Sequence, residues 1–464
     1  MTDATPTSPS PRPTAPPTAL TVREITEDDL DGWGRAYSKG NFVPYRTASL
    51  ERRRGVFEPG RWLGAYEGGE CVGTFRGLAL DLSVPGGALL PVLGVSSLAV
   101  VPSHRRRGIL SALMAHGLGA AVARGEAAAV LHSAEYPVYG RYGFAPATRH
   151  GGFTVDVTAS GGLRPDLDTS GTLREAAPEE VRRLGPALFD EARRSRAGAV
   201  SRPEWSWRRR TGAALLPGEE WEAQTVLVHR DGAGEARGLV TYTVDGKWSD
   251  RVPDATLTVT DLVATTAQAR RALWAHLLSV DWVRRIEVPD AAPDDPLPLL
   301  LRDPRAVRPL PHPADCLWLR LLDLPAALTA RTYPPGLRLA LRVADPAGHV
   351  DGVWLLRTGA DGSAEVTPDG GPADLALDAA APGRAPPRRR AGEQAGGGRA
   401  GHRADPGSGP PRGHPLPHHR RAVVPRPLLN ADGGGGPGNL RRRPTAAAPA
   451  ACTACAGSAR APGR

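Results

Sequence analysis

Leu98-Ala-Val-Val-Pro-Ser-His-Arg-Arg-Arg-Gly-Ile-Leu110 joins an apolar strand to the start of a helix through a short basic loop. A helix that begins near Arg106 leaves its first backbone N–H groups without partners inside the helix, and such groups bind anions. Gly108 has no Cβ, so a ligand can approach the main chain closely. The three arginines before it supply cationic donors for phosphate (Arg105, Arg106, Arg107). The stretch predicts a pyrophosphate cradle; an ordinary turn with a solvated arginine run is the alternative.

The residues around this loop alternate between strand and helix patterns. The stretch 89–101 predicts a central strand, 108–123 a long helix with apolar residues at helical spacing, and 128–132 the next strand. Upstream, two strands at 62–66 and 71–82 are joined by a glycine-containing hairpin turn. This order is typical of an α/β unit, which we expect to span residues 20–150.

Two motifs together resemble the Eis (enhanced intracellular survival) family of GNAT N-acetyltransferases. Arg105-x-x-Gly108 matches the GNAT acyl-CoA motif, although Leu110 stands where that motif ends in a small residue, and Tyr139-Gly-Arg-Tyr-Gly-Phe-Ala-Pro-Ala-Thr148 matches downstream. Further matches follow at Asp295–Asp303, at Cys316-Leu-Trp-Leu-Arg320 and at 325–331. The resemblance covers about residues 22–380.

The resemblance implies an α/β (α+β) architecture and an activity. It implies two tandem GNAT domains, a sterol-carrier-protein-like α+β domain, and transfer of acetyl from acetyl-CoA to amines such as aminoglycosides or lysine-type acceptors. Tyr139 would be the general acid for the leaving thiolate. The family's base, the carboxylate of a C-terminal Phe, is not present in this chain. Residues expected to contact acetyl-CoA are Leu98, Ala99, Val100, Arg105, Arg106, Arg107, Gly108, Ile109, Leu110, Ser111, Ala134 and Glu135.

The second unit, residues 151–295, repeats the element order of the first. A shift of about 164 positions places Ala272 over Gly108 and Trp274 over Leu110. A Cβ and an indole would crowd a phosphate, so we expect a degenerate domain without a cofactor. Residues 296–382 are predicted as a partial sterol-carrier-like domain and residues 1–19 as a disordered tail.

The last segment, residues 383–464, has no Phe, Trp or Tyr and cannot build a core. It holds fifteen arginines against three acidic residues, a charge of +12, so that residues 1–382 carry −3 of the total of +9. A basic interaction tail is one interpretation. We favour a frameshift near residues 380–384, because back-translation in one shifted phase yields family-like text in three blocks and a stop after Phe. Activity would then be weak or lost in the chain as given.

Partners and compartment follow from the same composition. A mildly acidic body suits cationic amines better than nucleic acid, and no apolar run reaches the length of a membrane span. We expect a cytoplasmic protein, hexameric by family resemblance, without metal: Cys452 and Cys455 have no second ligand pair. His104 and His132 are possible bases without visible partners. The alternative functions are a non-catalytic CoA-binding regulator with a basic tail and, third, a nucleic-acid binder.

Overall fold

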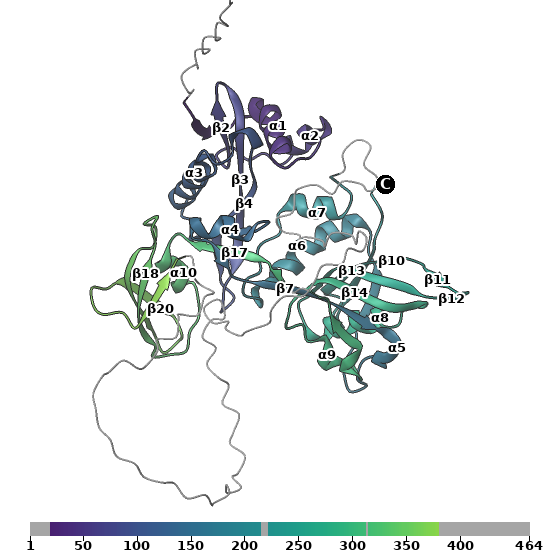
Figure 1. Ribbon diagram of the computed structural model, residues 1–464. Coiled ribbons are helices and arrows are strands. Elements are labelled where there is room, and N and C mark those ends of the chain that lie inside the picture. Colours follow the sequence, from purple (N-terminus) through teal and green to yellow (C-terminus); the bar gives the residue numbers. More distant parts are fainter. Residues whose placement is uncertain (1–18, 215–220, 312–313, 380–464) are drawn as a thin grey trace, which may run out of the picture.

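The computed structural model describes residues 19–214, 221–311 and 314–379, which form three units (Figure 1). The expectations for the N-terminal tail up to residue 18 and for residues 383–464, including the frameshift and Cys452 and Cys455, lie outside these ranges. The described part of the chain folds around three main sheets, of seven, eight and four strands.

Seven strands form the first sheet: β1 (Thr21–Glu24), β2 (Trp62–Glu67), β3 (Glu70–Ser83), β4 (Leu89–Val100), β5 (Ala128–His132), β6 (Ala145–Pro146) and β17 (Leu317–Leu321). They lie in the order β1-β2-β3-β4-β5-β17-β6. The strands β4 and β5 are parallel and pair only between Val92–Gly94 and Ala128–Val130. Beyond Gly94 the two strands separate, so within the described chain the edge of β4 that faces β5 has no strand partner.

Helices α1 (Leu30–Gly40) and α3 (Ile109–Ala123) cover opposite faces of this sheet (Figure 1). Leu63 of β2 packs with α3 in the main core, whereas its neighbour Trp62 packs with Trp33 of α1, as the alternation of a strand requires. The predicted strands at 89–101 and 128–132 and the helix at 108–123 are confirmed. The shorter helices are η1 (Glu27–Asp29), α2 (Ala48–Arg54), η2 (Pro102–His104), α4 (Tyr136–Tyr139) and η3 (Gly140–Tyr142).

The second sheet has eight strands: β7 (Arg149–Asp156), β8 (Thr172–Glu175), β9 (Thr225–Arg230), β10 (Ala236–Val244), β13 (Ala255–Ala264), β14 (Val283–Ala291), β15 (Val307–Pro309) and β16 (Ala314–Asp315). The strands β13 and β14 are parallel, as β4 and β5 are in the first sheet, which confirms the tandem repeat. Its helices are α5 (Val157–Ser160), α6 (Pro178–Arg194), α7 (Glu204–Arg210), α8 (Ala267–Leu277), α9 (Leu297–Leu300) and η4 (Pro304–Ala306).

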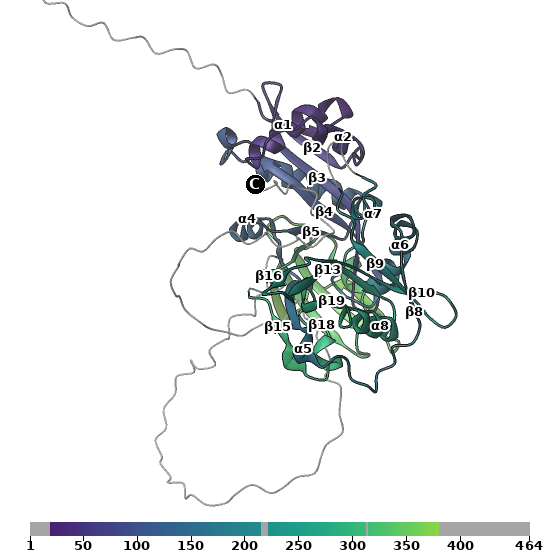
Figure 2. The ribbon, with the colours of Figure 1, turned by 90° about the vertical axis from the view of Figure 1, so that its right-hand side faces the viewer.

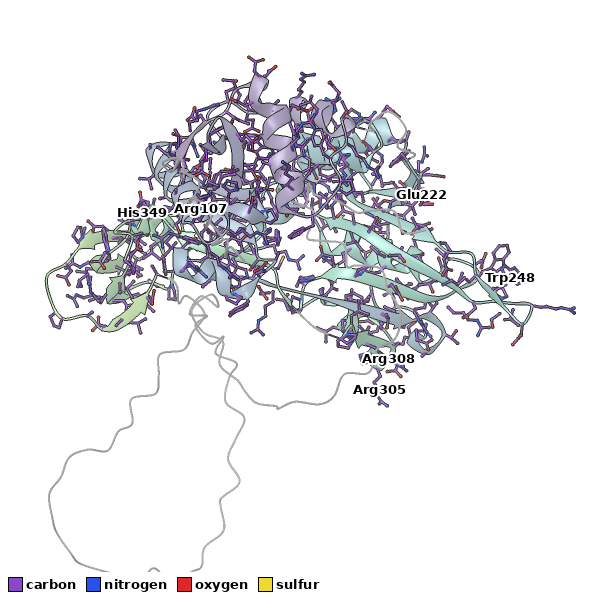
Figure 3. All side chains as sticks on the ribbon, turned by 45° about the horizontal axis from the view of Figure 1, so that its top comes forward. Arg107, Glu222, Trp248, Arg305, Arg308 and His349 are labelled. Carbon is purple, nitrogen blue, oxygen red and sulfur yellow. The ribbon has the colours of Figure 1, made fainter. Side chains whose placement is uncertain are left out.

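A short hairpin of β11 (Trp248–Ser249) and β12 (Val252–Pro253) projects from the second unit. Figure 3 shows Trp248 near the outer end of this projection, well separated from Arg107 of the first unit. On the opposite side the segment 198–201 runs along the end of β3, where the N–H of Ser83 donates to the carbonyl of Ala199 at 2.8 Å. This pairing brings α6 and α7 next to the first sheet (Figure 2).

Each of the two large sheets includes a strand that lies outside its own repeat in the sequence. In the second sheet β14 is flanked by β7, which directly follows the first repeat in sequence. In the first sheet the corresponding place beside β5 is filled by β17, which follows the second repeat. The sequence predicted residues 296–382 as the third unit. The first strands of that range, β15, β16 and β17, instead complete the first two sheets, because an alternating pattern specifies a strand but not its partner.

The third unit comprises α10 (Leu324–Thr329) and a sheet of β18 (Arg338–Ala344), β19 (Gly352–Thr358), β20 (Ala364–Pro368) and β21 (Leu375–Asp378). The strand order is β20-β19-β18-β21. Its small core contains Leu324, Val343 and Val350, and Leu321 at the end of β17 packs against it. The third unit is therefore attached to the first sheet through β17, as Figure 1 shows.

Candidate active site

The last residues of β4 run along the opening between β4 and β5. The register between β3 and β4 shifts at Thr74, and Ser97 takes a left-handed φ of +48°. Thr74 Oγ1 donates to the carbonyl of Ser97 at 2.8 Å and fixes this irregularity. Bulges of this kind redirect a strand next to binding sites. Leu98–Val100 are left with one edge unpaired, next to the start of α3.

The loop between β4 and α3 exposes its main chain over residues 105–108. Arg106 has φ +62° and Gly108 has φ +81°, so two left-handed residues lie within three positions. The N–H groups of residues 106–108 donate to no group in the described parts of the protein. A Cβ at Gly108 would meet nothing within 4 Å. Consecutive unpaired N–H groups in such a turn form an anion-binding nest. The predicted helix start near Arg106 is wrong by three residues: Gly108 is the N-cap and α3 begins at Ile109.

The three arginines of this loop differ in what they bind. Arg105 donates to the carbonyl of Gly40 at 2.7 Å and to that of Val100 at 3.2 Å, and so ties the loop to α1 and β4. Arg107 donates to the carboxylate of Glu67 at 3.0 Å. Arg106 is exposed and has no ion pair or hydrogen bond with any described side chain or backbone group. Of the three, Arg106 is the cation best placed to meet a ligand.

Glu67 at the end of β2 organises the outer side of the loop. Its carboxylate also lies 3.0 Å from Nε2 of His104, whose Nδ1 is 2.9 Å from Oγ of Ser103. The hydrogen bond from Arg107 holds the pKa of Glu67 below its ordinary value. His104, predicted without a partner, is therefore engaged by a residue far away in sequence. Arg107 lies on the surface of the first unit (Figure 3).

Tyr139 lies at the end of α4, on the β5 side of the opening. It is half-buried and packs against the same core as Leu98, Val100 and Leu110, and its ring meets Phe144 edge-on with centroids 6.3 Å apart. Burial raises the pKa of the Tyr139 phenol, and the negative charge of Glu135 raises it further. The phenol is thereby kept protonated at neutral pH, as a proton donor requires.

The remaining predicted residues surround the same opening. Ser111 in the first turn of α3 lies 3.1 Å from the hydroxyl of Tyr142, so the α3 end and the tyrosine turn are linked. Ala134 and Glu135 are exposed just after β5. His132, the other possible base, has its Nδ1 3.9 Å from the thiol of Cys316 on the β17 side. The predicted residues thus collect around one opening, except that the guanidiniums of Arg105 and Arg107 are held by the protein.

The second unit has no equivalent of the loop. The strand β13 ends at Ala264 and α8 begins at Ala267, so two residues join them where eight join β4 and α3. Thr266 caps α8 by accepting the N–H of Ala269 at 3.1 Å. Ala272 and Trp274, which the 164-residue shift placed over the cradle, lie inside α8 and face the core. The loop is shortened, and one of the helix's first N–H groups is already satisfied.

Three residues that shape the site were not predicted. Glu67 holds Arg107, Gly40 approaches β4 so closely that a Cβ would lie 2.8 Å from that of Ala99, and Arg320 underlies the turn after Tyr139. Each contact joins segments far apart in sequence, so no local sequence pattern could have predicted it. Within the described ranges there is no cluster of three metal-ligating side chains, and none of the described helices has both the length and the apolar character for crossing a bilayer.

Comparisons with known proteins find relatives along most of the chain. The acetyltransferase (GNAT) domain family matches residues 21–147, and a second GNAT domain family matches residues 198–321. An uncharacterized N-acetyltransferase of Streptomyces avermitilis is 41% identical over 368 residues, 78% of this chain and 87% of the relative. N-acetyltransferase Eis of Mycobacterium tuberculosis is 35% identical over 325 residues, 68% of this chain and 75% of the relative. The crystal structure of Eis1 from Mycobacterium abscessus superimposes with a TM-score of 0.66 at 31% identity, covering 78% and 88% of the two chains.

Proposed function

Since the chain belongs to the Eis family of GNAT acetyltransferases, we propose that it transfers acetyl from acetyl-CoA to primary amines, aminoglycosides and lysine-type side chains among them. The observation that carries the proposal is that two neighbouring stretches of backbone in the first unit have hydrogen-bonding groups without partners among the described residues. The N–H groups of residues 106–108 form an anion nest, and the free edge of β4 begins beside it. Together they suit a ligand with a phosphate end and an amide-containing arm.

Acetyl-CoA binds, in this proposal, with its pyrophosphate on the nest and its arm along β4. The N–H groups of residues 106–108 and the side chain of Arg106 hold the phosphates, with the dipole of α3 behind them. The free edge of Leu98–Val100 accepts the pantetheine amides as an added strand would. Ile109, Leu110 and Ser111 line the helix side, and Ala134 and Glu135 the β5 side.

The acetyl step needs a proton donor for the leaving sulfur. The amine nitrogen attacks the thioester carbon, the carbon–sulfur bond breaks, and the Tyr139 hydroxyl gives its proton to the thiolate. The phenol carries this proton at neutral pH, since the ordinary pKa of a phenol is already about 10 and burial raises that of Tyr139 further. The acceptor amine must lose a proton as well, and we assign that role to the C-terminal Phe carboxylate that the family resemblance implies, a group expected only in the frame-corrected chain. Cytoplasmic location, a hexamer and a sterol-carrier-like third unit belong to the same proposal.

Steady-state release of free thiol from acetyl-CoA tests the proposed activity. Kanamycin and a lysine-containing peptide serve as acceptors, and both the chain as given and a frame-corrected version are measured. We expect acceptor-dependent thiol release, faster in the frame-corrected chain. Tight CoA binding with no acceptor-dependent release in either chain would favour the regulatory alternative.

Arg106→Ala is expected to raise KM for acetyl-CoA about tenfold, because one charge-assisted bond to phosphate is lost. The matched control removes a neighbouring pair together, Glu67→Gln with Arg107→Gln. It should raise KM by less than about threefold, since Arg107 is already committed to Glu67. Initial rates over a range of acetyl-CoA concentrations measure both. Equal effects of the two variants would remove the special role given to Arg106.

Glu135→Gln is expected to move the alkaline limb of the kcat profile to lower pH. The negative charge of Glu135 contributes to the raised pKa of Tyr139, so its removal lowers that pKa, and the phenol is lost as an acid at a lower pH. The shift should be small, because burial is the larger cause of the raised pKa. An unchanged limb would show that Tyr139 does not govern it.

A further inference from the structure

A buried ion pair joins the third unit to the first sheet. Arg320 on β17 donates from one Nη to both carboxylate oxygens of Asp345, at 3.0 Å each, and their side chains are 1% and 0% exposed. Asp345 follows β18 and also accepts the N–H groups of Ala347 and Val350, both at 3.1 Å. The carboxylate is thus fixed by its own loop, and through it the guanidinium is fixed as well.

The guanidinium of Arg320 lies directly against Gly143. A Cβ at Gly143 would stand 1.6 Å from one Nη of Arg320 and 2.8 Å from its Cζ, and Gly143 has φ +79°. Glycine is therefore required twice, by the left-handed backbone and by the close approach of the side chain. The side chain of Arg320 therefore packs directly beneath the turn at Gly143.

The turn at Gly143 holds the backbone of Tyr139. The N–H of Gly143 donates to the carbonyl of Gly140 at 3.0 Å, and the N–H of Phe144 donates to the carbonyl of Tyr139 at 3.3 Å. The Phe144 ring packs on the Tyr139 ring. The next residue, Ala145, pairs with Leu319, the neighbour of Arg320 on β17. A contiguous path of contacts therefore runs from Asp345 through Arg320 and Gly143 to Tyr139.

We propose that the Arg320–Asp345 pair is a positioning device for Tyr139, through which the third unit sets the orientation of the phenol. This rests on the role proposed for Tyr139 above. A planar guanidinium held by Asp345 and lying against Gly143 keeps the turn in one place, and a catalytic group displaced by about 1 Å can cost about a hundredfold in rate. Arg320 itself touches neither substrate nor cofactor in this scheme.

The test replaces both charges at once, Arg320→Met with Asp345→Leu, in the full chain that shows turnover. Paired apolar replacement leaves no orphaned charge, so the fold should persist, as circular dichroism will show. We expect kcat to fall about 10- to 100-fold and KM for acetyl-CoA to stay within about twofold. The alkaline limb should also move to lower pH, because the loosened phenol gains water. The matched control is Arg270→Met with Asp295→Leu, a pair with side chains 23% and 13% exposed in the second unit, which should leave kcat, KM and the alkaline limb unchanged.

Combination with Tyr139→Phe separates failure of this inference from failure of the proposed function. If Tyr139 is the acid and the pair positions it, the triple variant is no slower than Tyr139→Phe alone. A folded double variant with wild-type kcat and pH limb overturns the positioning role while Tyr139→Phe stays slow. A fully active Tyr139→Phe overturns the role of the tyrosine instead. Should the double variant not fold, Arg320→Lys decides: it keeps the charge but not the planar support, and wild-type kcat and pH limb in it would equally overturn the proposal.

Discussion

Tyr139→Phe is expected to lower kcat for acetyl transfer by about 10²- to 10⁴-fold, the range for loss of a general acid. Phenylalanine keeps the ring that packs on Phe144 and removes only the hydroxyl, so KM for acetyl-CoA should stay within about twofold. Without the hydroxyl, the thiolate, whose pKa is about 8.5, leaves unprotonated or takes its proton from water. Thiol-release kinetics at saturating acetyl-CoA measure the effect.

The pH profile gives this prediction a second readout. Since the pKa of Tyr139 is raised, the wild-type rate should hold on the alkaline side until above about pH 10, and Tyr139→Phe should lack that limb. Tyr142→Phe is the control: its hydroxyl is 3.1 Å from Ser111 and has no assigned proton transfer, so kcat should change less than about threefold. A Tyr139→Phe enzyme with wild-type kcat would refute the acid role.

Asp345→Ala is expected to lower the free energy of unfolding by about 3–5 kcal/mol, the cost of breaking a buried ion pair by removing one partner. The guanidinium of Arg320 would remain inside the protein with no counter-charge, at 1% exposure. Two N–H groups, those of Ala347 and Val350, would lose their acceptor as well. Urea unfolding measures the change.

The control for Asp345→Ala is Asp351→Ala on the surface. Asp351 pairs with Arg342 at 3.4 Å, where both side chains are more than 40% exposed. Exposed pairs contribute little, so the loss should stay near about 1 kcal/mol, including the hydrogen bond from the Asp345 N–H. Equal losses of unfolding free energy in the two variants would show that burial does not make the Arg320–Asp345 pair more important to stability than an exposed pair.

Local patterns predicted most elements but not their partners. The long helix expected at 108–123 was predicted to within one residue of α3 at each end, because its apolar residues recur at helical spacing within one continuous stretch. The segment that forms β17 was assigned to the third unit, within residues 296–382. Its place beside β5 depends on contacts with residues nearly two hundred positions earlier in the sequence. A short alternating stretch does not specify which strand it will pair with.

The site was predicted at the level of segments and less well at the level of side chains. The strand–loop–helix from Leu98 to Leu110 and the Tyr139 motif were found because their residues are close together in sequence. Arg105 binds the carbonyl of Gly40 and Arg107 binds the carboxylate of Glu67, and these partners come close only in the folded chain. The 164-residue shift likewise aligned the strands but not the loop, since it allowed for no deletion. The partners of Arg105 and Arg107 and the length of the second unit's loop are therefore seen only in the folded structure.

The proposed function requires one acetyl-CoA site per chain, in the first unit, built on the loop that ends at Gly108. Calorimetric titration of the full chain with CoA tests it most directly, beside Gly108→Val, whose branched side chain cannot readily adopt φ +81° at the N-cap of α3. We expect one CoA bound per chain and at least about tenfold weaker binding in Gly108→Val. Two CoA molecules per chain, or undiminished affinity in Gly108→Val, would contradict it.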